Sequence, residues 1–309
     1  MIITNTLGLP DAFVKAASTG AYPPSLWRHR VSQLTGSVRM RWFELARWDE
    51  LRSDASERLW AIMGTMLHNF IAEHCGDNEI SEERLTYHHT IGERSVAISG
   101  QADLLTQIGP DSYRLTDWKF CKVAALSYDK TNWLMQLRCY AWLYSLVGFP
   151  VKEAELVLIL RNREAYKAAF TFDYPQSDVV RYPVDLWDFK TVESWSREMS
   201  ERLILADELA VAGAPEDEVP PCSDEERWYT PERWAAKKKR ATRASRVFNN
   251  EADAVAYIAA REKPEDYVID HRLGRSVRCG YCAARHLCSQ WAEQQVLESA
   301  DNTEEGDSE

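Results

Sequence analysis

The sequence lacks long hydrophobic runs: no stretch approaches the roughly 18 apolar residues that a membrane-spanning helix needs. The N-terminus, MIITNTLGLPDAF, also lacks the basic start and long apolar core of a secretory signal. These absences argue against a membrane protein, and we expect a cytoplasmic location, in a bacterium or in the host of a phage. At 309 residues, with 45% hydrophobic residues, the chain is long enough for one large core or two modest domains.

Basic residues are in the minority, with 37 Lys and Arg against 48 Asp and Glu and a net charge of −11. This balance argues only superficially against nucleic acid, because part of the acidity lies in residues 293–309, which we expect to form a disordered tail. Local charge matters more. Arg and Trp alternate through residues 21–52, a mixture that can hold a nucleic-acid strand by phosphate contacts and base stacking. An amphipathic helix with a polar face explains it equally well.

Cysteine is neither abundant nor paired: the count of seven is odd, which argues against a disulfide framework and for a reducing compartment. Cys279-x-x-Cys282 and the nearby Cys288 have the spacing of metal-binding thiolates, with Gly280 favouring the tight turn. Cys222 follows the linker-like residues 213–221 and is the best fourth ligand, with His286 as a competitor. Cys75, Cys121 and Cys139 lie within regular elements and are expected to be ordinary small apolar residues, and zinc is the default metal for four thiolates.

The most informative stretch is GQADLLTQIGPDSYRLTDWK, residues 100–119, which predicts two strands joined by a turn at Gly109-Pro110-Asp111. Asp103 lies in an apolar run, where a buried carboxylate needs a cation or a hydrogen-bond network. Asp117 and Lys119 are two residues apart, so on a strand they share one face. Two carboxylates beside one ammonium are what a hydrolytic magnesium site requires.

Helical patterns flank this hairpin. Asp54 and Glu57 resemble a capping box before an apolar helix that carries His68, which by itself is more often a half-buried histidine than a ligand. After the hairpin, NWLMQLRCYAWLYSLVG predicts a helix with Gln136 and Tyr140 one turn apart, a pair that by spacing alone favours the polar edge of a core helix. We further expect strands over AELVLILRN and AYKAAFTFDY and a long charged helix over residues 185–212. This order predicts an α/β fold with a mixed central sheet.

Four motifs in register carry a resemblance to a known family. They are Gly64-x-x-x-His68, Gly100-x-x-Asp103, Asp117-Trp118-Lys119 and Gln136-x-x-x-Tyr140. Together they resemble the PD-(D/E)xK nucleases of the RecB type, which include CRISPR-adaptation nucleases and phage exonucleases, so a phage or bacterial origin is expected. The resemblance covers roughly residues 55–165 and implies a restriction-endonuclease-like core. The chain departs from the commonest pattern in having Asp rather than Glu at position 117.

By carry-over from the family, His68, Asp103, Asp117 and the Trp118 carbonyl would bind Mg²⁺ or Mn²⁺. Lys119 would orient the attacking water or stabilise the pentacovalent phosphate, and Gln136 and Tyr140 would support the site or contact the scissile strand. The trailing cysteines resemble a four-iron four-sulfur (4Fe-4S) clasp. In the relatives the first cysteine usually precedes the core, however, and here no cysteine comes before Cys75, which leaves zinc open and makes Cys222 a hypothesis.

The implied function is a metal-dependent DNA exonuclease of recombination, repair or phage DNA processing, acting on single strands or DNA ends, with a recombinase or a single-strand annealing or binding protein as partner. The alternatives are a structure-specific endonuclease and a non-catalytic DNA-binding protein. The expected organisation is a helical, DNA-contacting segment at 1–53, a nuclease core at 54–212, a helical metal-clasp region at 213–292 and the acidic tail at 293–309. The basic run Lys237-Lys238-Lys239-Arg240 with Arg243 and Arg246 is either a solvated face or a DNA track.

Overall fold

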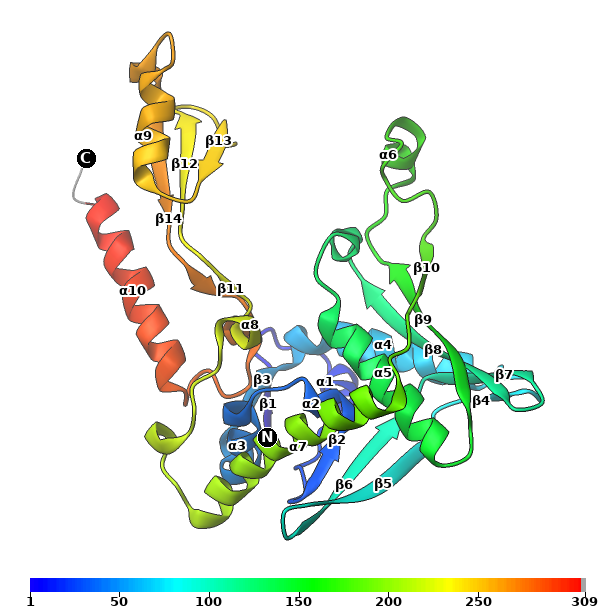
Figure 1. Cartoon of the computed structure of the whole chain (residues 1–309). Helices are drawn as coiled ribbons and strands as arrows, with labels where there is room; N and C mark the ends of the chain where they lie inside the picture. Colours follow the sequence, from blue (N-terminus) through cyan, green and yellow to red (C-terminus); the bar gives the residue numbers. More distant parts are fainter. Residues whose placement is uncertain (307–309) are drawn as a thin grey trace. The chain divides into compact units, whose positions relative to one another are not determined.

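The chain divides into two compact units, Met1–Pro220 and Pro221–Glu309, in a computed structural model that describes residues 1–306 (Figure 1). The division falls within the expected linker at residues 213–221. The N-terminal unit carries the predicted hairpin and the C-terminal unit carries the cysteine-rich end. No helix within residues 1–306 is long and apolar enough to cross a membrane.

A five-stranded mixed sheet forms the centre of the N-terminal unit, as predicted, in the order β10-β9-β8-β7-β4. Its strands are β4 (Glu79–Ile80), β7 (Leu104–Gly109), β8 (Ser112–Cys121), β9 (Val151–Leu160) and β10 (Val179–Pro183). β8 runs parallel to β9, and the other neighbours are antiparallel. The β7–β8 turn lies at Pro110-Asp111, as the sequence predicts. A parallel pair needs a long crossover, which the helix between β8 and β9 supplies.

A second sheet of three strands has the order β2-β6-β5. It contains β2 (Arg28–Arg30), β5 (Arg84–Ile91) and β6 (Arg94–Gln101). The β5–β6 hairpin turns at Gly92-Glu93, where Gly92 has a φ of 59°, the left-handed conformation that a two-residue hairpin turn requires. A further short pair joins β1 (Ile2–Thr4) to β3 (Arg52–Asp54) in parallel.

Helices cover these sheets. They are α1 (Asp11–Ser18), α2 (Val31–Leu34), α3 (Val38–Ala46), α4 (Leu59–Ala72), α5 (Thr131–Leu146), α6 (Ala165–Phe170) and α7 (Phe189–Ala212). A turn capped by Asp54 and Glu57 leads into α4, as predicted. The fully buried side chains of Leu137 and Leu143 on α5 join Leu115, Leu156 and Leu158 of β8 and β9 in one core. Burying a leucine contributes about 2 kcal/mol, so this layer fixes α5 against the sheet that carries the hairpin.

Gly100 is where α5 and the second sheet approach most closely. A Cβ atom at Gly100 would lie 2.8 Å from side-chain carbons of both Tyr140 and Leu143. Tyr144 adds a polar tie, because its hydroxyl accepts from the Ala102 amide at 3.1 Å and donates to the Glu83 carbonyl at 2.5 Å. The glycine therefore lets the end of β6 pack on α5, and this contact fixes the backbone three residues before Asp103.

A buried ion cluster ties β2 and α3 to α7. The carboxylate of Asp207, fully buried, accepts from Arg41 Nε at 2.7 Å and from the Trp27 amide at 2.7 Å, and lies 3.3 Å from His29 Nε2. Burial alone would raise the pKa of Asp207, but the hydrogen bonds from His29 and Arg41 outweigh it and lower the pKa. Breaking such a buried pair by removing one partner costs about 3–5 kcal/mol.

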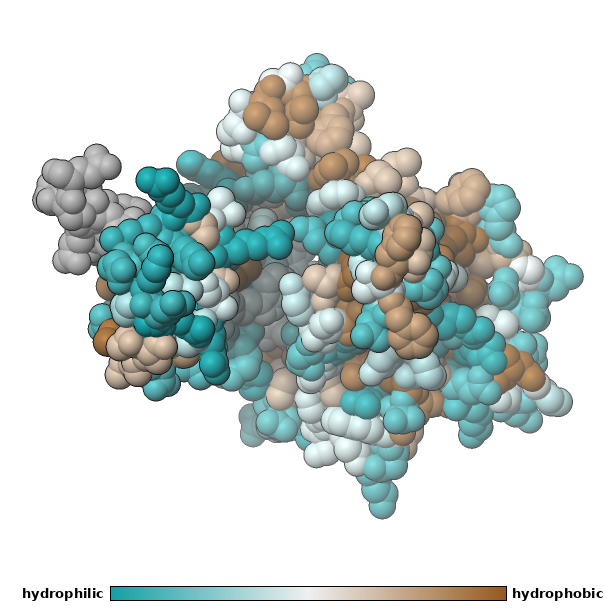
Figure 2. Space-filling model, turned by 90° about the horizontal axis from the view of Figure 1, so that it is seen from above, coloured by the Kyte–Doolittle hydropathy of each residue, from teal (hydrophilic) through white to brown (hydrophobic). Residues whose placement is uncertain are grey.

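Two expectations for the N-terminal unit are wrong in detail. The segment AYKAAFTFDY, expected to be a strand, forms α6 and a turn, because its alanines favour a helix and Lys167 pairs with Glu164 one turn away. The segment from α6 to Phe172 carries three exposed aromatic side chains, Tyr166, Phe170 and Phe172. On the face seen from above, Figure 2 shows apolar side chains scattered among hydrophilic ones. Residues 1–53, expected to be helical, also contain the strands β1 and β2.

The C-terminal unit is predicted to be helical, but it contains both strands and helices. A three-stranded antiparallel sheet, β13-β12-β14, packs against α9, and Ala235 and Ala236 of β12 and Ala254 of α9 are fully buried. The elements are α8 (Asp224–Arg227), β11 (Tyr229–Thr230), β12 (Arg233–Lys238), β13 (Arg246–Phe248), α9 (Glu251–Ala259), β14 (Tyr267–Arg272), β15 (Arg275–Ser276) and α10 (Ser289–Gly306). The expected disordered tail at 293–309 is helical through Gly306, since residues 290–300 contain no glycine or proline; 307–309 lie outside the described residues.

Candidate metal centre

Asp103 lies between β6 and β7, at the point where the chain passes from one sheet to the other. Its side chain is nearly buried, and Oδ2 accepts a hydrogen bond from the Trp118 amide of β8 at 2.8 Å. The Ser81 hydroxyl donates to the Asp103 carbonyl at 2.6 Å and fixes the backbone. The Asp103 carboxylate is thus oriented by β8 through Oδ2, and its other oxygen, Oδ1, faces His68.

Asp117 and Lys119 occupy the same face of β8, as the two-residue spacing predicts. Asp117 is 3% exposed, and its Oδ2 lies 2.6 Å from Lys119 Nζ. The contact is close enough for an ion pair but lacks hydrogen-bond alignment, so this buried oxygen has no hydrogen-bond donor among the described residues. A buried carboxylate oxygen with an open lone pair is suited to a cation.

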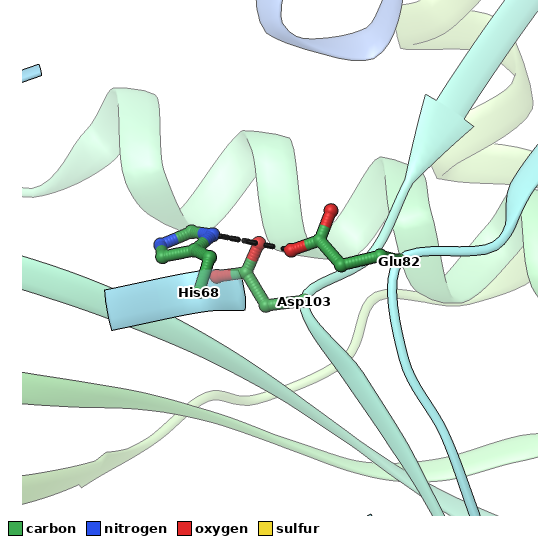
Figure 3. Close-up of side chains that lie close together, drawn as sticks. All are labelled: His68, Glu82 and Asp103. Carbon is green, nitrogen blue, oxygen red and sulfur yellow. Dashed lines mark hydrogen bonds and ion pairs between the residues drawn. The ribbon is translucent and has the colours of Figure 1, made fainter. Parts of the chain in front are cut away.

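His68 reaches the two acidic loops from α4 (Figure 3). Its Nδ1 lies 3.3 Å from Glu82 Oε1 and 3.4 Å from Asp103 Oδ1. One possible ligand atom from each of these three residues lies within 4.8 Å of the other two. Among the described residues, this is the cluster of His, Cys, Asp or Glu side chains that is close enough to hold a metal ion. The helix, the loop before β5 and the β6–β7 junction therefore converge on one point.

Glu82 is the residue that the sequence analysis missed. It has a φ of 57°, the left-handed region that a non-glycine residue rarely adopts, and its amide donates to the Ala102 carbonyl at 3.2 Å. The Gln101 side chain donates to Glu82 Oε2. Backbone strain of this kind often marks a functional position. Nothing in the sequence distinguishes Glu82 from its neighbour Glu83, so only the fold identifies it.

Negative charge exceeds positive charge at this point, with the carboxylates of Glu82, Asp103 and Asp117 against His68 and Lys119. Burial and then the Asp117 charge raise the pKa of Asp103 to about 7. The hydrogen bond to Glu82 raises the pKa of His68 in spite of its burial, and the same contact lowers the pKa of Glu82. The crowding of carboxylates favours a further cation beside Asp103 and Asp117.

The donor set fits a small divalent cation. Carboxylate oxygens suit Mg²⁺ and Mn²⁺, and an imidazole is compatible with Mn²⁺. The close approach of His68, Glu82 and Asp103, beside an Asp117 Oδ2 whose one charged contact is Lys119, is the arrangement that such an ion would complete. The role of the Trp118 carbonyl as a ligand stays a prediction; its amide is the group that contacts Asp103.

Gln136 and Tyr140 lie on α5, and Gln136 Nε2 donates to the Tyr140 hydroxyl at 3.0 Å. Tyr140 is 6% exposed and packs below Gly100, which agrees with the polar edge of a core helix. Burial raises the pKa of Tyr140, and the charges of Asp117 and Asp103 add to the effect, so the phenol lies near the carboxylates. Direct contact of this pair with a substrate stays a prediction.

The expected DNA contact at residues 21–52 is partly wrong. Arg39 is buried and donates to the Val219 carbonyl at 2.7 Å, and Arg41 is buried against Asp207. Both guanidiniums tie helices together and cannot reach a phosphate. Arg28 and Arg30, in contrast, are exposed on β2.

The four candidate cysteines all belong to the C-terminal unit. Burial, and then the charges of Cys282, Cys222 and Cys288, raise the pKa of Cys279 to about 11. Cys222 is anchored through its backbone, which exchanges two hydrogen bonds with the Gln290 side chain at 3.0 and 2.9 Å. Among the described residues the four sulfurs do not form a group within 4.8 Å, so a metal clasp stays a prediction.

Of the remaining cysteines, Cys121 and Cys139 are part of the hydrophobic core, as expected, whereas Cys75 is half-buried and lies in the loop between α4 and β4, outside the regular elements. The competing ligand His286 is exposed. Of the basic run, Lys238, Lys239, Arg240, Arg243 and Arg246 are exposed at the β12–β13 hairpin, and Lys237 lies 3.8 Å from Asp270. This exposure agrees with either a solvated face or a DNA track.

Comparison with known proteins places these features in a family. No curated protein matches the chain. One solved structure, described as "Crystal structure of SSO0001", matches with a TM-score of 0.44 and 19% identity, covering 62% of this chain and 83% of the other, a likeness too distant to carry an argument. The model of the PD-(D/E)XK nuclease superfamily matches residues 9–289. Its match over most of the chain shows that this protein belongs to the PD-(D/E)XK nuclease superfamily.

Proposed function

We propose that the protein is a metal-dependent DNA exonuclease. The observation that carries the proposal is the convergence of His68, Glu82 and Asp103 beside the Asp117–Lys119 ion pair. The family implies phosphodiester hydrolysis by a nuclease. The four matched motifs of the RecB type support the exonuclease assignment within that broader activity.

In this proposal His68, Glu82, Asp103 and Asp117 hold one or two Mg²⁺ or Mn²⁺ ions, and the Trp118 carbonyl completes the set. A bound divalent ion lowers the pKa of a coordinated water, neutralises the phosphate and stabilises the leaving oxygen. Asp103 is held in place by the Trp118 amide and Asp117 by its position in β8, so the carboxylates need little reorganisation.

Lys119 acts at the phosphate. Its side chain is 20% exposed and its Nζ lies 2.6 Å from Asp117 Oδ2, so the lysine is beside the metal site and remains accessible. With the Asp117 carboxylate bound to a cation, the Lys119 ammonium would be free to donate to a phosphate oxygen or to orient the attacking water. Gln136 and Tyr140 support the site from α5 through their mutual hydrogen bond.

The cysteines of the C-terminal unit are proposed to hold a 4Fe-4S cluster, with zinc as the alternative. The effect of three thiols, those of Cys282, Cys222 and Cys288, on the pKa of Cys279 supports this grouping. Anaerobic purification tests the assignment. A brown sample that loses its colour in Cys279→Ser supports iron and sulfur, and a colourless sample with one zinc per chain supports zinc. A metal-free wild-type protein would refute both.

The exonuclease proposal is tested with linear and closed circular DNA of the same sequence, single-stranded and double-stranded, in Mg²⁺ or Mn²⁺. We expect mononucleotides or short products from linear DNA, no cutting of circles and no activity in EDTA. Cutting of circles would show an endonuclease instead. Binding without cutting in either metal would support a non-catalytic DNA-binding protein and refute the proposal.

A further inference from the structure

A cavity of about 660 Å³ opens beside the metal centre and is not explained by the metal ligands. His68 and Glu82 form part of its wall, and the rest comes from the N-terminal segment, α4 and the β2-β6-β5 sheet. Its basic residues are Arg28, Arg30 and Arg84. The chain as a whole carries −11, so three arginines around one cavity run against the overall charge.

Strand alternation explains why the arginines gather. In β2 the side chain of His29 is fully buried, whereas Arg28 and Arg30, on either side of it, point the other way and are exposed. Arg30 pairs with Ser99 of β6, and Arg84 of β5 pairs with Gln101 of the same strand. Ser99 and Gln101 are two apart, so the three arginines stand on one face of the sheet.

The cavity is also linked to the metal centre by direct contacts. Arg84 donates to Gln101 Oε1 at 2.5 Å, and Gln101 donates in turn to Glu82, which faces His68. Glu82 is the one carboxylate in the wall, and it already has His68 and Gln101 as partners. Tyr22, which is 66% exposed, and Pro23 add apolar surface at the rim.

We propose that this cavity is a phosphate-binding pocket, in which Arg28, Arg30 and Arg84 hold a phosphate group of the nucleic-acid strand that lies at the metal centre. The inference rests on the proposed nuclease function and adds a second anchoring point to it. Guanidiniums bind phosphate oxygens through paired N–H donors, and Ser99 and Gln101 supply further donors. The Tyr22 ring offers a stacking surface for a base.

The test separates binding from cutting. Affinity of a 12-nucleotide single strand with an internal fluorescent label is measured by anisotropy in EDTA, from 50 to 300 mM salt. The variants are Arg28→Gln/Arg30→Gln and Arg84→Gln. The matched control is Arg52→Gln, an exposed strand arginine outside the cavity. Circular dichroism and unfolding midpoints confirm that all variants are folded.

We expect the double variant to bind about 10- to 100-fold more weakly at 100 mM salt and Arg84→Gln about 3- to 10-fold more weakly, with Arg52→Gln unchanged. The slope of log affinity against log salt should fall by about 0.7 for each phosphate that a variant no longer neutralises. Strands with a 5′-phosphate, a 3′-phosphate or two hydroxyl ends identify the source of the phosphate. A preference for one phosphorylated end that the variants lose indicates a terminal phosphate, and equal weakening of all strands indicates an internal one.

Failure of the pocket and failure of the nuclease proposal are distinguishable. Wild-type affinity and salt slope in both pocket variants would overturn the pocket, even if the protein degrades DNA. Weakened binding in the variants, with no cutting by the wild type in Mg²⁺ or Mn²⁺, would support the pocket and refute the nuclease proposal.

Discussion

Replacing Asp103 with Asn should stabilise the metal-free protein and abolish its response to metal. Asn has the same size and retains an oxygen to accept from the Trp118 amide at 2.8 Å, so the substitution removes charge and little else. In the wild type, burial and Asp117 raise the pKa of Asp103 from 3.8 to about 7. Because the folded-state pKa of Asp103 is raised, its contribution to the stability of the metal-free protein is fully present below pH 3.8 and is lost as the pH rises through the folded-state pKa.

The size of the effect follows from that shift. Each pKa unit corresponds to about 1.4 kcal/mol, so ionised Asp103 destabilises the folded state by up to roughly 4 kcal/mol at pH 8. That shift already includes the attraction between Asp103 and His68 at 3.4 Å, and an Asn amide does not reproduce every contact of the protonated carboxyl, so only part of the gain is realised. We expect a net increase of about 1–2 kcal/mol in the free energy of unfolding in EDTA. For the wild type, Mn²⁺ at ten times its dissociation constant should add about 1.4 kcal/mol.

Urea unfolding at pH 8, in EDTA and in Mn²⁺, measures both effects. Asp111→Asn in the β7–β8 turn is the matched control and should behave as the wild type in both buffers. Two results would refute the reasoning: a variant less stable than the wild type in EDTA, or equal stabilisation of variant and wild type by Mn²⁺.

Three further predictions concern single residues. Glu82→Gln should weaken Mn²⁺ binding about 10-fold or more in calorimetry, whereas Glu83→Gln should not; equal affinities would remove Glu82 from the metal set. Gly100→Ala should lower the free energy of unfolding by about 1–3 kcal/mol, because its Cβ would lie 2.8 Å from Tyr140 and Leu143, while Gly64→Ala, which meets nothing within 4 Å on α4, should raise it by up to about 1 kcal/mol. Burial lowers the pKa of His89 from 6.5 to about 4, so the stability that neutral His89 contributes above pH 6.5 should be lost by roughly 2–3 kcal/mol as the pH falls toward 4. Asp103 acts in the opposite direction in both proteins, so the measurement compares the wild type with His89→Gln, and equal changes in their free energies of unfolding between pH 7 and 4.5 would contradict this.

The parts of the site that the sequence predicts are those set by short-range spacing. Asp117 and Lys119 share a face of β8 because a strand has a period of two, and the motif order links them to Asp103 and His68. The hairpin turn at Pro110-Asp111 and the helix over Thr131–Leu146 are confirmed for the same reason. Local patterns therefore suffice wherever the local structure alone fixes the direction of a side chain.

What the sequence does not predict depends on tertiary contacts. Glu82 enters the site because a left-handed residue before β5 turns its carboxylate toward α4, which no pattern in SEERL encodes. Arg39 and Arg41 look like Arg28 and Arg30 in the sequence, yet the former are buried by carbonyl and carboxylate partners from residues 207–220. The α6 segment has the aromatic residues of a strand, but its alanines and the Glu164–Lys167 pair favour a helix.

The central claim is that this metal centre hydrolyses phosphodiester bonds. Its most direct test is the release of label from end-labelled linear DNA in Mg²⁺ by the wild type, Asp117→Asn and Lys119→Ala, all shown to be folded. We predict label release by the wild type and a loss of at least about 100-fold in both variants. Release at the wild-type rate by either variant would contradict the assignment of the site.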